Sequence, residues 1–366
     1  MKKILAGVAV SALCLYLVLR GVHWESIPAH LAGANLGLLA VSMLCMVGAY
    51  ACMAWRWSHL LAPLTDGPPP GFPTLFGTMM TGYFFNTFFP ARAGDLVRAH
   101  LMSRRTGLSR TTILATVVIE KLFDGLALLV LLVAGLPALG LGNGQADQLG
   151  AVAVVVLVLA LGGLLVFKWQ SERAVALTAR LVQVLPLPQR VGSLAVRLVH
   201  TFSAGLGVFE RPGPLIKSAA ISLLVWIVAA GMFWSAIAAF GLPLSGLSAV
   251  LLMTALVNLG LLIPAMPGNV GNYEALVIGT LALITASTIN KDLAVAFALV
   301  FHVSQLLATL LVGGIAFWSQ HVSLREARDD AGEAVSSAPR GAPADLSGHL
   351  THPARDEAAE LGIEKL

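Results

Sequence analysis

Two short segments interrupt the apolar pattern of this chain and carry most of its candidate chemistry. They are residues 86–98 (NTFFPARAGDLVR) and residues 264–274 (PAMPGNVGNYE), and each places proline, glycine and a carboxylate between long apolar runs. Hydrocarbon cannot satisfy free backbone N–H and C=O groups, so backbone that leaves a helix at membrane depth must be buried in protein or line a wet cavity. We therefore expect the function of the protein at these two breaks.

The first break could bind an anion. Pro90 ends one helix and Gly94 with Asp95 begins the next, so this second helix should present free N–H groups and a positive dipole end. Arg92 adds a guanidinium, which suits a phosphate such as that of a lipid. In the alternative interpretation, Asp95 only caps its helix and pairs with Arg98, while Arg92 extends to lipid headgroups.

A second charged cluster lies inside the apolar run of residues 111–136. Glu120 and Asp124 share one helix face, and Lys121 can neutralise Asp124. Ionisable groups inside a membrane usually face the bundle interior, so we expect this trio to meet Arg92 and Asp95 in one polar chamber. The alternative is an ion network that only locks the bundle together.

The second break is rich in glycine and asparagine. Gly271 or Asn272 would cap the following helix, with Glu274 in its first turn, where an acid complements the helix dipole. Glu274 could have this capping role alone. The unwound run that includes Pro267 and Gly268 requires a cavity or a moving hinge at that depth.

Other residues indicate little chemistry. The cysteines lie in apolar runs and the histidines show no metal-ligand spacing, so we predict no metal and no cofactor. No phosphate-binding loop or nucleophile elbow is found, and we predict that the protein is not an enzyme. His302 and Gln305 suggest a contact between helices. The run Trp55, Arg56 and Trp57 is typical of an anchor at the membrane interface.

Composition defines the elements that must position these residues. The chain is 57% hydrophobic and 11% charged, with a mean hydropathy of +0.83, which predicts an all-α polytopic membrane protein. Six apolar runs could cross the membrane: 4–20, 36–57, 111–136, 151–168, 215–240 and 293–319. Two more apolar segments, 73–105 and 247–288, contain the breaks.

The distribution of Lys and Arg predicts how the chain threads the membrane. Residues 92–110, with five Arg, and residues 168–217, with both Lys and Arg, should be cytoplasmic, as should the N-terminus, whereas 137–150 and 241–247 contain neither residue. This pattern fits if 73–100 and 247–288 are re-entrant hairpins that enter from opposite sides. Such a layout, with Pro90 and Gly94 echoed by Pro267 and Gly271, suggests an inverted repeat.

Two segments fall outside the membrane bundle. Residues 171–212 are too polar to cross and predict short amphipathic helices on the cytoplasmic surface, within a transmembrane domain of residues 1–320. Residues 321–366 have no apolar periodicity and predict a disordered cytoplasmic tail.

These motifs, in this order, resemble those of one family. N-x-x-x-P-x-R-x-G-D-x-x-R, E-K-x-x-D and P-G-N-V-G-N-Y-E are similar to the lysylphosphatidylglycerol synthase transmembrane-region family, also called flippase-like membrane proteins, over roughly residues 1–320. The chain differs from the usual pattern in having Asp95 for Glu, Lys121 for Arg and Asn269 for Gly. An aminoacyltransferase domain is not expected in the short remaining tail.

The resemblance implies a bacterial inner-membrane protein that moves or positions phospholipids, polyprenyl-linked or hopanoid-type lipids. It implies membrane lipids with a phosphate-bearing headgroup as partners, no nucleic acid, and an envelope-biogenesis enzyme as a candidate partner. A membrane enzyme acting on a lipid-linked substrate and a non-transporting scaffold are the alternatives. The predicted substrate-binding residues are Asn86, Arg92, Gly94, Asp95, Arg98, Glu120, Lys121, Asp124, Pro267, Gly268, Gly271 and Glu274.

Overall fold

The computed structural model describes residues 13–16, 18–65, 67–89, 92–140, 148, 151–152, 155, 212–244, 246–262 and 267–320. The described residues form helices and turns, with no strand among them. The elements are α2 (Ile27–Ala32), α3 (Leu36–Leu61), η1 (Ala62–Leu64), α4 (Phe72–Phe88), α5 (Ala93–Thr106), α6 (Arg110–Gly135), η3 (Leu136–Leu139), α10 (Pro212–Ala239), α11 (Leu247–Gly260), η5 (Pro267–Asn269), α12 (Asn272–Ile284) and α13 (Lys291–Ser319).

Four helices in the described part of the chain are long and apolar enough to cross a membrane. They cover Leu36–Leu64, Arg110–Leu139, Ile216–Ala239 and Lys291–Ser319. These match four of the six predicted spans and confirm the all-α polytopic fold. The predicted span 4–20 lies largely outside the described residues, as does 151–168, and the surface segment 171–212 and the tail 321–366 lie outside them almost entirely.

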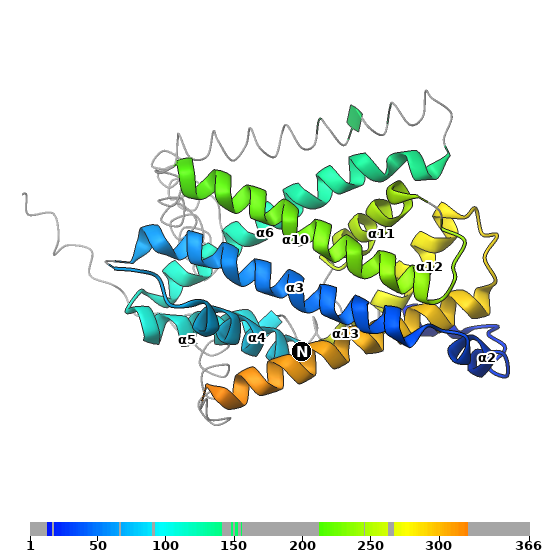
Figure 1. The fold of residues 1–366 in the computed structure, drawn as a ribbon, viewed down its shortest axis with the longest axis horizontal. Helices are drawn as coiled ribbons and strands as arrows, with labels where there is room; N and C mark the ends of the chain where they lie inside the picture. Colours follow the sequence, from blue (N-terminus) through cyan, green and yellow to red (C-terminus); the bar gives the residue numbers. More distant parts are fainter. Residues whose placement is uncertain are drawn as a thin grey trace, which may run out of the picture.

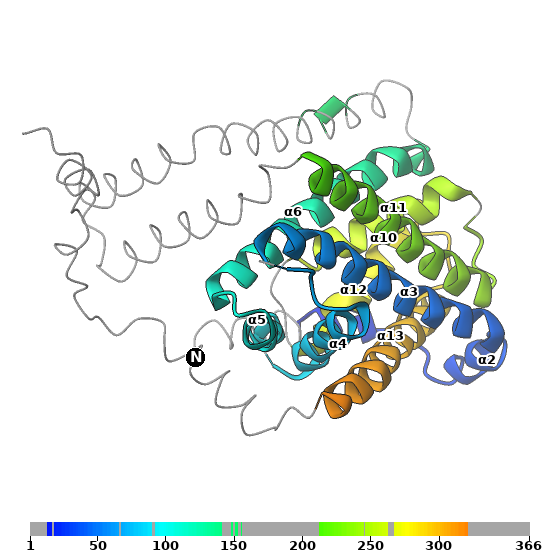
Figure 2. The same cartoon turned by 60° about the vertical axis from the view of Figure 1, so that its left-hand side comes forward.

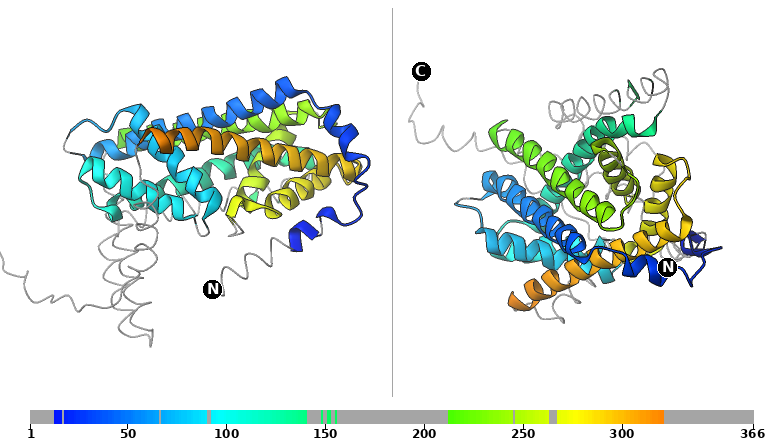
Figure 3. Two further views of the ribbon diagram at one scale, coloured as in Figure 1. Left: turned by 90° about the horizontal axis from the view of Figure 1, so that it is seen from below. Right: turned by 45° about the vertical axis from the view of Figure 1, so that its right-hand side comes forward.

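Each predicted hairpin is a pair of short helices separated by a break. The helices have 17 and 14 residues in α4 and α5, and 14 and 13 residues in α11 and α12. About 20 residues are needed to cross the hydrocarbon core, so none of these four helices is long enough alone. Within each pair the two helices pack together. Figure 1 and Figure 3 show the two hairpins toward opposite ends of the bundle.

The described helices repeat one arrangement twice, a long helix, a broken hairpin and another long helix. The first copy is α3, α4, α5 and α6, and the second is α10, α11, α12 and α13. Helices α3 and α10 pack side by side (Figure 1, Figure 2). Helix α13 packs on α4 and on α3, and correspondingly α6 packs on α11 and on α10. These matching contacts, with hairpins at opposite ends, are those of an inverted repeat.

Polar side chains at the helix starts explain where the long helices begin. The side chains of Asn35, Ser109 and Asn290 accept hydrogen bonds from backbone N–H groups in the first turns of α3, α6 and α13. Asparagine and serine are among the preferred N-cap residues because they satisfy N–H groups that have no partner within the helix. These three long helices are therefore capped by their own sequence.

The first hairpin depends on a close approach between Gly82 of α4 and Gly94 of α5. A Cβ atom built on Gly94 would lie 1.9 Å from the carbonyl oxygen of Gly82 and 2.8 Å from the backbone nitrogen of Asn86. Both of these neighbours are backbone atoms, which cannot move aside without shifting a helix. The glycine pair therefore fixes how tightly the two helices pack beside the first break.

We predict that Gly94→Ala destabilises the protein, because its added methyl group must push α4 and α5 apart. Overpacking of this kind costs about 1–3 kcal/mol. Gly125→Ala in α6 is the matched control, since a Cβ there meets nothing within 4 Å, and replacing a helical glycine by alanine is favourable. Thermal unfolding in detergent should show a lower unfolding temperature for Gly94→Ala and an equal or higher one for Gly125→Ala. Equal unfolding temperatures for both variants would contradict this packing.

Candidate functional site

The first break holds Arg92 in an unusual backbone conformation. Arg92 is the N-cap residue of α5 and has φ 56° and ψ 41°, the left-handed region that costs a residue with a Cβ roughly 1–2 kcal/mol. Its exposed guanidinium donates from Nη2 to the carbonyl oxygen of Leu261 at 3.2 Å. Leu261 is the C-cap residue of α11. Arg92 thus links the first break to the helix end that precedes the second break.

The second break lies against the same region of the bundle. Segment η5 packs on α4, and a Cβ built on Gly268 would lie 3.6 Å from the carbonyl oxygen of Thr87. Asn269 has φ 55° and precedes Gly271 by two residues, as Arg92 precedes Gly94. The two halves therefore place a left-handed residue at matching positions, and the two breaks lie next to each other.

The start of α5 is capped by a side chain from α4. Asn86 accepts the Gly94 N–H at its Oδ1 atom at 2.8 Å, and its Nδ2 atom donates to Asp95 at 3.4 Å. The prediction that the N–H groups of this helix start are free is therefore wrong for Gly94. Asn86 and Asp95 organise the break.

Arg98 and Glu120 form a buried ion pair that joins the first hairpin to α6. Arg98 Nη2 lies 2.7 Å from Glu120 Oε2, and each side chain is 2% exposed. Asp95 also faces Arg98, with 3.5 Å between Oδ1 and Nε. The Arg98 guanidinium lies over the Trp57 ring, 5.1 Å from its centroid. The alternative interpretation of the first break predicted a pair between Asp95 and Arg98. This pair is present, as part of a larger network.

Asp124 is held by Arg56, a residue of the predicted interfacial anchor. Arg56 Nη1 donates to Asp124 Oδ1 at 2.6 Å and to Ser222 of α10 at 2.8 Å, and Trp226 Nε1 donates to Asp124 at 3.3 Å. Lys121 Nζ lies 3.9 Å from Asp124 Oδ2 and is 32% exposed. One carboxylate thus ties α3, α6 and α10 together.

The prediction of an interfacial anchor at residues 55–57 is wrong for two of its three members. Arg56 and Trp57 are fully buried, and only Trp55 is exposed, at 47%. Trp57 donates from Nε1 to Thr116 at 3.0 Å. Three consecutive helical residues point in different directions, so not all of the run could face lipid, but this does not reveal the partner of Arg56.

The predicted polar chamber is therefore divided. Glu120 reaches Asp95 through Arg98, whereas Arg92 neither hydrogen-bonds nor pairs with Glu120, Lys121 or Asp124 in the described residues. The prediction that Arg92 joins this trio is wrong because the Arg92 side chain extends toward α11. Substrate binding by the predicted residues stays a prediction.

Several atoms of the ion network lack hydrogen-bond partners among the described residues. Arg56 Nε, Arg98 Nη1 and Glu120 Oε1 are buried without a partner. Charged groups buried in this way cost several kcal/mol unless water or a ligand satisfies them. The network therefore has capacity for bound water or a polar ligand group.

A second ionic pair joins the second hairpin to α13. Glu274 Oε1 lies 2.7 Å from His302 Nδ1, with exposures of 4% and 6%. The other oxygen of Glu274 accepts the N–H of Gly271 at 2.7 Å, and Gly271 is the N-cap residue of α12. Gln305 donates to Tyr273. The expected contact between helices at His302 and Gln305 is confirmed, and Glu274 caps its helix and also pairs with histidine.

Polar side chains continue along α13 from this pair toward the first hairpin. His302, Gln305 and Thr309 repeat at helical spacing, and Thr309 Oγ1 lies 3.2 Å from the Tyr50 hydroxyl of α3. The Tyr50 ring stacks on Tyr83 of α4 with 4.7 Å between centroids. The seam between α13, α3 and α4 is thus polar across the interior.

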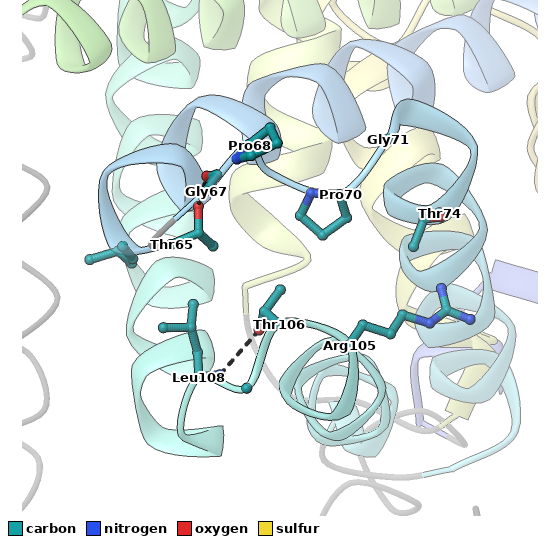
Figure 4. A pocket seen from close by; sticks show the side chains of 11 residues that line it. Thr65, Gly67, Pro68, Pro70, Gly71, Thr74, Arg105, Thr106 and Leu108 are labelled. Atoms are coloured by element: carbon teal, nitrogen blue, oxygen red, sulfur yellow. Dashed lines mark hydrogen bonds between the residues drawn. The ribbon is translucent and has the colours of Figure 1, made fainter.

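A separate pocket of about 720 Å³ opens between the α3–α4 connection and the α5–α6 connection (Figure 4). It is lined by Leu64, Thr65, Gly67, Pro68, Pro70, Gly71, Thr74, Arg105, Thr106, Gly107 and Leu108. Arg105 donates to Thr78 at 3.0 Å, and partial burial lowers the pKa of its guanidinium. No residue of this pocket belongs to the predicted site. In the described residues, no group of three or more His, Cys, Asp or Glu could hold a metal ion.

These features define a polytopic helical membrane protein with two broken hairpins and buried charge pairs. The chain belongs to the Lysylphosphatidylglycerol synthase TM region family, which matches residues 4–313, and the predicted family is confirmed. The match establishes a multi-pass membrane protein; a bacterial inner membrane and the orientation of the termini stay predictions.

Two relatives are archaeal. The chain is 25% identical over 360 residues to Glycosyltransferase AglD of Haloferax volcanii, covering 90% of this chain and 56% of that protein. It is 23% identical over 290 residues to UPF0104 membrane protein of Methanothermobacter thermautotrophicus, covering 73% of this chain and 80% of that protein. The chain thus spans little more than half the length of the first relative.

The first relative corrects one prediction. We predicted that the chain is not an enzyme because it lacks familiar catalytic motifs, but a protein that matches 90% of the chain is named a glycosyltransferase. That prediction is wrong on this finding, since the absence of a phosphate-binding loop or nucleophile elbow does not exclude a glycosyltransferase.

The Arg98–Glu120 pair provides a test of the network. Removing one partner leaves an uncompensated buried charge, so we predict that Arg98→Met and Glu120→Leu each destabilise the protein by about 3–5 kcal/mol. The double variant should be much more stable than the sum of these two losses, because it buries no lone charge. Unfolding in detergent measures all three variants and closes the double-mutant cycle. Additive losses would show that the two side chains do not interact.

Proposed function

We propose that this protein binds a lipid with a phosphate-bearing headgroup where its two breaks meet and moves the headgroup between the two faces of the membrane. The observation that carries this proposal is Arg92, an exposed guanidinium in a left-handed conformation at the junction of the two hairpins. Strained residues of this kind persist where the surrounding structure requires them, and they cluster at ligand sites.

The surroundings of Arg92 favour it as the phosphate contact. Arg98 and Arg56 are buried and paired with carboxylates, and Lys121 lies 3.9 Å from Asp124. Among the described residues, Arg92 donates to a carbonyl oxygen and forms no ion pair, so a phosphate could replace that neutral acceptor with a charge-assisted and bidentate contact. The ligand would thus compete with the link between the two hairpins.

The inverted repeat supports movement between leaflets. Hairpins that enter from opposite ends and meet at their breaks resemble the arrangement in which a central site is opened to either side by rocking one repeat against the other. The link from Arg92 to Leu261 joins the two repeats. If a lipid phosphate replaced the Leu261 carbonyl oxygen as the acceptor of Arg92, one repeat would be released from the other.

We predict that Arg92→Gly slows lipid movement without reducing stability. Glycine adopts the left-handed conformation without a Cβ penalty, so the unfolding temperature should equal or exceed that of the parent. Loss of a charge-assisted contact worth about 1.5–3 kcal/mol should slow movement at least tenfold. The rate is measured in proteoliposomes that contain a fluorescent phospholipid, by quenching the outer leaflet. Arg92→Lys keeps the charge, so its rate should fall less than that of Arg92→Gly.

Arg104→Ala is the control for this experiment. Arg104 is exposed in the last turn of α5, away from the break, and its loss should leave the rate unchanged. Equal rates for Arg92→Gly and the parent, across anionic, zwitterionic and polyprenyl phosphate lipids, would refute the proposal.

A second candidate function is transfer of a sugar to or from a lipid-linked substrate. The name of the Haloferax volcanii relative favours it. In that case the same lipid phosphate site would hold the substrate, and a labelled sugar should change its carrier in detergent solution without any change of leaflet. Turnover that Arg92→Gly removes would favour this function, and movement without turnover would favour translocation.

A further inference from the structure

We propose that Glu274 and His302 form a proton-binding site that controls the second break. The proposal rests on the proposed function only in its consequence, that lipid handling is coupled to protons. The site itself follows from the contacts of one carboxylate. Glu274 holds His302 with one oxygen and the Gly271 N–H with the other, both at 2.7 Å.

The charge of the pair depends on one proton. A neutral imidazole and an ionised carboxylate together carry one negative charge. One added proton makes the pair neutral, either as His⁺ with Glu⁻ or as neutral His with protonated Glu. Without that proton the pair carries one negative charge in a site where the side chains are 4% and 6% exposed. A buried charge without a counter-charge is strongly unfavourable, so the dry geometry fits the proton-bound pair.

Among the described residues, no third charged side chain pairs with Glu274 or His302. Tyr273 of α12 stacks on His302 with 4.4 Å between ring centroids, and Tyr50 lies on α3, which packs on α13. Phenols are neutral near pH 7. Helix α11 and segment η3, which pack on α12, contain no ionisable side chain. The other described helices that pack on α13 bring Tyr83 from α4, His30 from α2, and Cys45, Cys52, Arg56 and His59 from α3, where Arg56 is paired with Asp124. Helix α13 itself carries Lys291 and Asp292 at its start, where Asp292 pairs with His23. No described residue other than its partner pairs with either group.

The same carboxylate fixes the backbone of the break. Gly271 has φ 83° and ψ −48°, and its N–H is held by Glu274 at the first turn of α12. When the proton leaves, the lone negative charge favours hydration of the site, and water competes for the Gly271 N–H. The segment 267–271 then opens toward water. Proton release would therefore open the second break, and proton uptake would close it.

The corresponding ion pair in the first half cannot lose a proton in this way. There Arg98 pairs with Glu120, and arginine does not lose its proton in proteins. The first hairpin is thus joined to its long helix by a permanent pair, and the second by a pair that can titrate. The described structure holds one hairpin fixed and leaves the other responsive to pH.

The test measures access to the break directly. The native cysteines Cys14, Cys45 and Cys52 are replaced by alanine, and a cysteine is introduced at Val270, which is 40% exposed. A second protein carries its cysteine at Phe89 beside the first break, 36% exposed. Thiolate formation raises both maleimide labelling rates with pH, so the ratio of the two rates is the readout.

We expect the ratio to rise about tenfold between pH 6 and pH 9, which corresponds to about 1.4 kcal/mol in favour of the open break. Glu274→Gln should abolish the rise, because glutamine keeps the shape and hydrogen bonds but leaves no charge when His302 loses its proton. His302→Gln should show a high ratio already at pH 7, falling only where the carboxylate itself binds a proton.

A ratio that is independent of pH in the parent, or that rises equally in Glu274→Gln, would overturn the proton site. Size-exclusion elution and labelling at position 89 establish that each variant is folded, and His302→Gln provides the decision if Glu274→Gln does not fold. Labelling requires no lipid movement, so this outcome is independent of the Arg92→Gly experiment. Loss of lipid movement with intact pH-dependent labelling would refute the proposed function and keep the proton site.

Discussion

The structure depends on one constraint, that polar backbone inside a membrane must find its partners within the protein. Each hairpin has polar backbone groups at its break, and the described ones are bound by other parts of the protein. Asn86 of α4 caps the start of α5, Glu274 caps the start of α12, and Arg92 donates to the last turn of α11. The hydrogen bond from Arg92 and the packing of η5 on α4 join the two breaks.

The same constraint explains the charged side chains. Arg56, Arg98, Glu120 and Asp124 are buried between helices that would otherwise pack as apolar surfaces, and each is paired. Such pairs add little net stability compared with apolar packing, but a misplaced partner is costly. They therefore select one arrangement of α3, α5, α6 and α10 over the many that apolar helices allow.

Much of this arrangement could be predicted from the sequence. Proline and glycine mark both breaks, and the structure has a pair of short packed helices around each. How these hairpins enter the membrane stays a prediction from the basic segments. The pairing could not be predicted. Arg56 lies between two tryptophans, a pattern typical of an interface, and only the packing of α3 on α6 and α10 turns it inward toward Asp124. Helical periodicity defines a face, but not which helix meets it.

The two halves show how one backbone plan can carry two kinds of chemistry. Arg92 and Asn269 share the left-handed conformation and the spacing to the following glycine, so the shape of the break is repeated although the side chain is not. The first half has a cation at this position and a permanent ion pair behind it. The second half has a neutral amide at this position and a carboxylate–imidazole pair behind it. An inverted repeat with identical charges would treat both faces of the membrane alike. Under the two proposals, a phosphate would engage one half and a proton the other, so this difference in charge would give the bundle a direction.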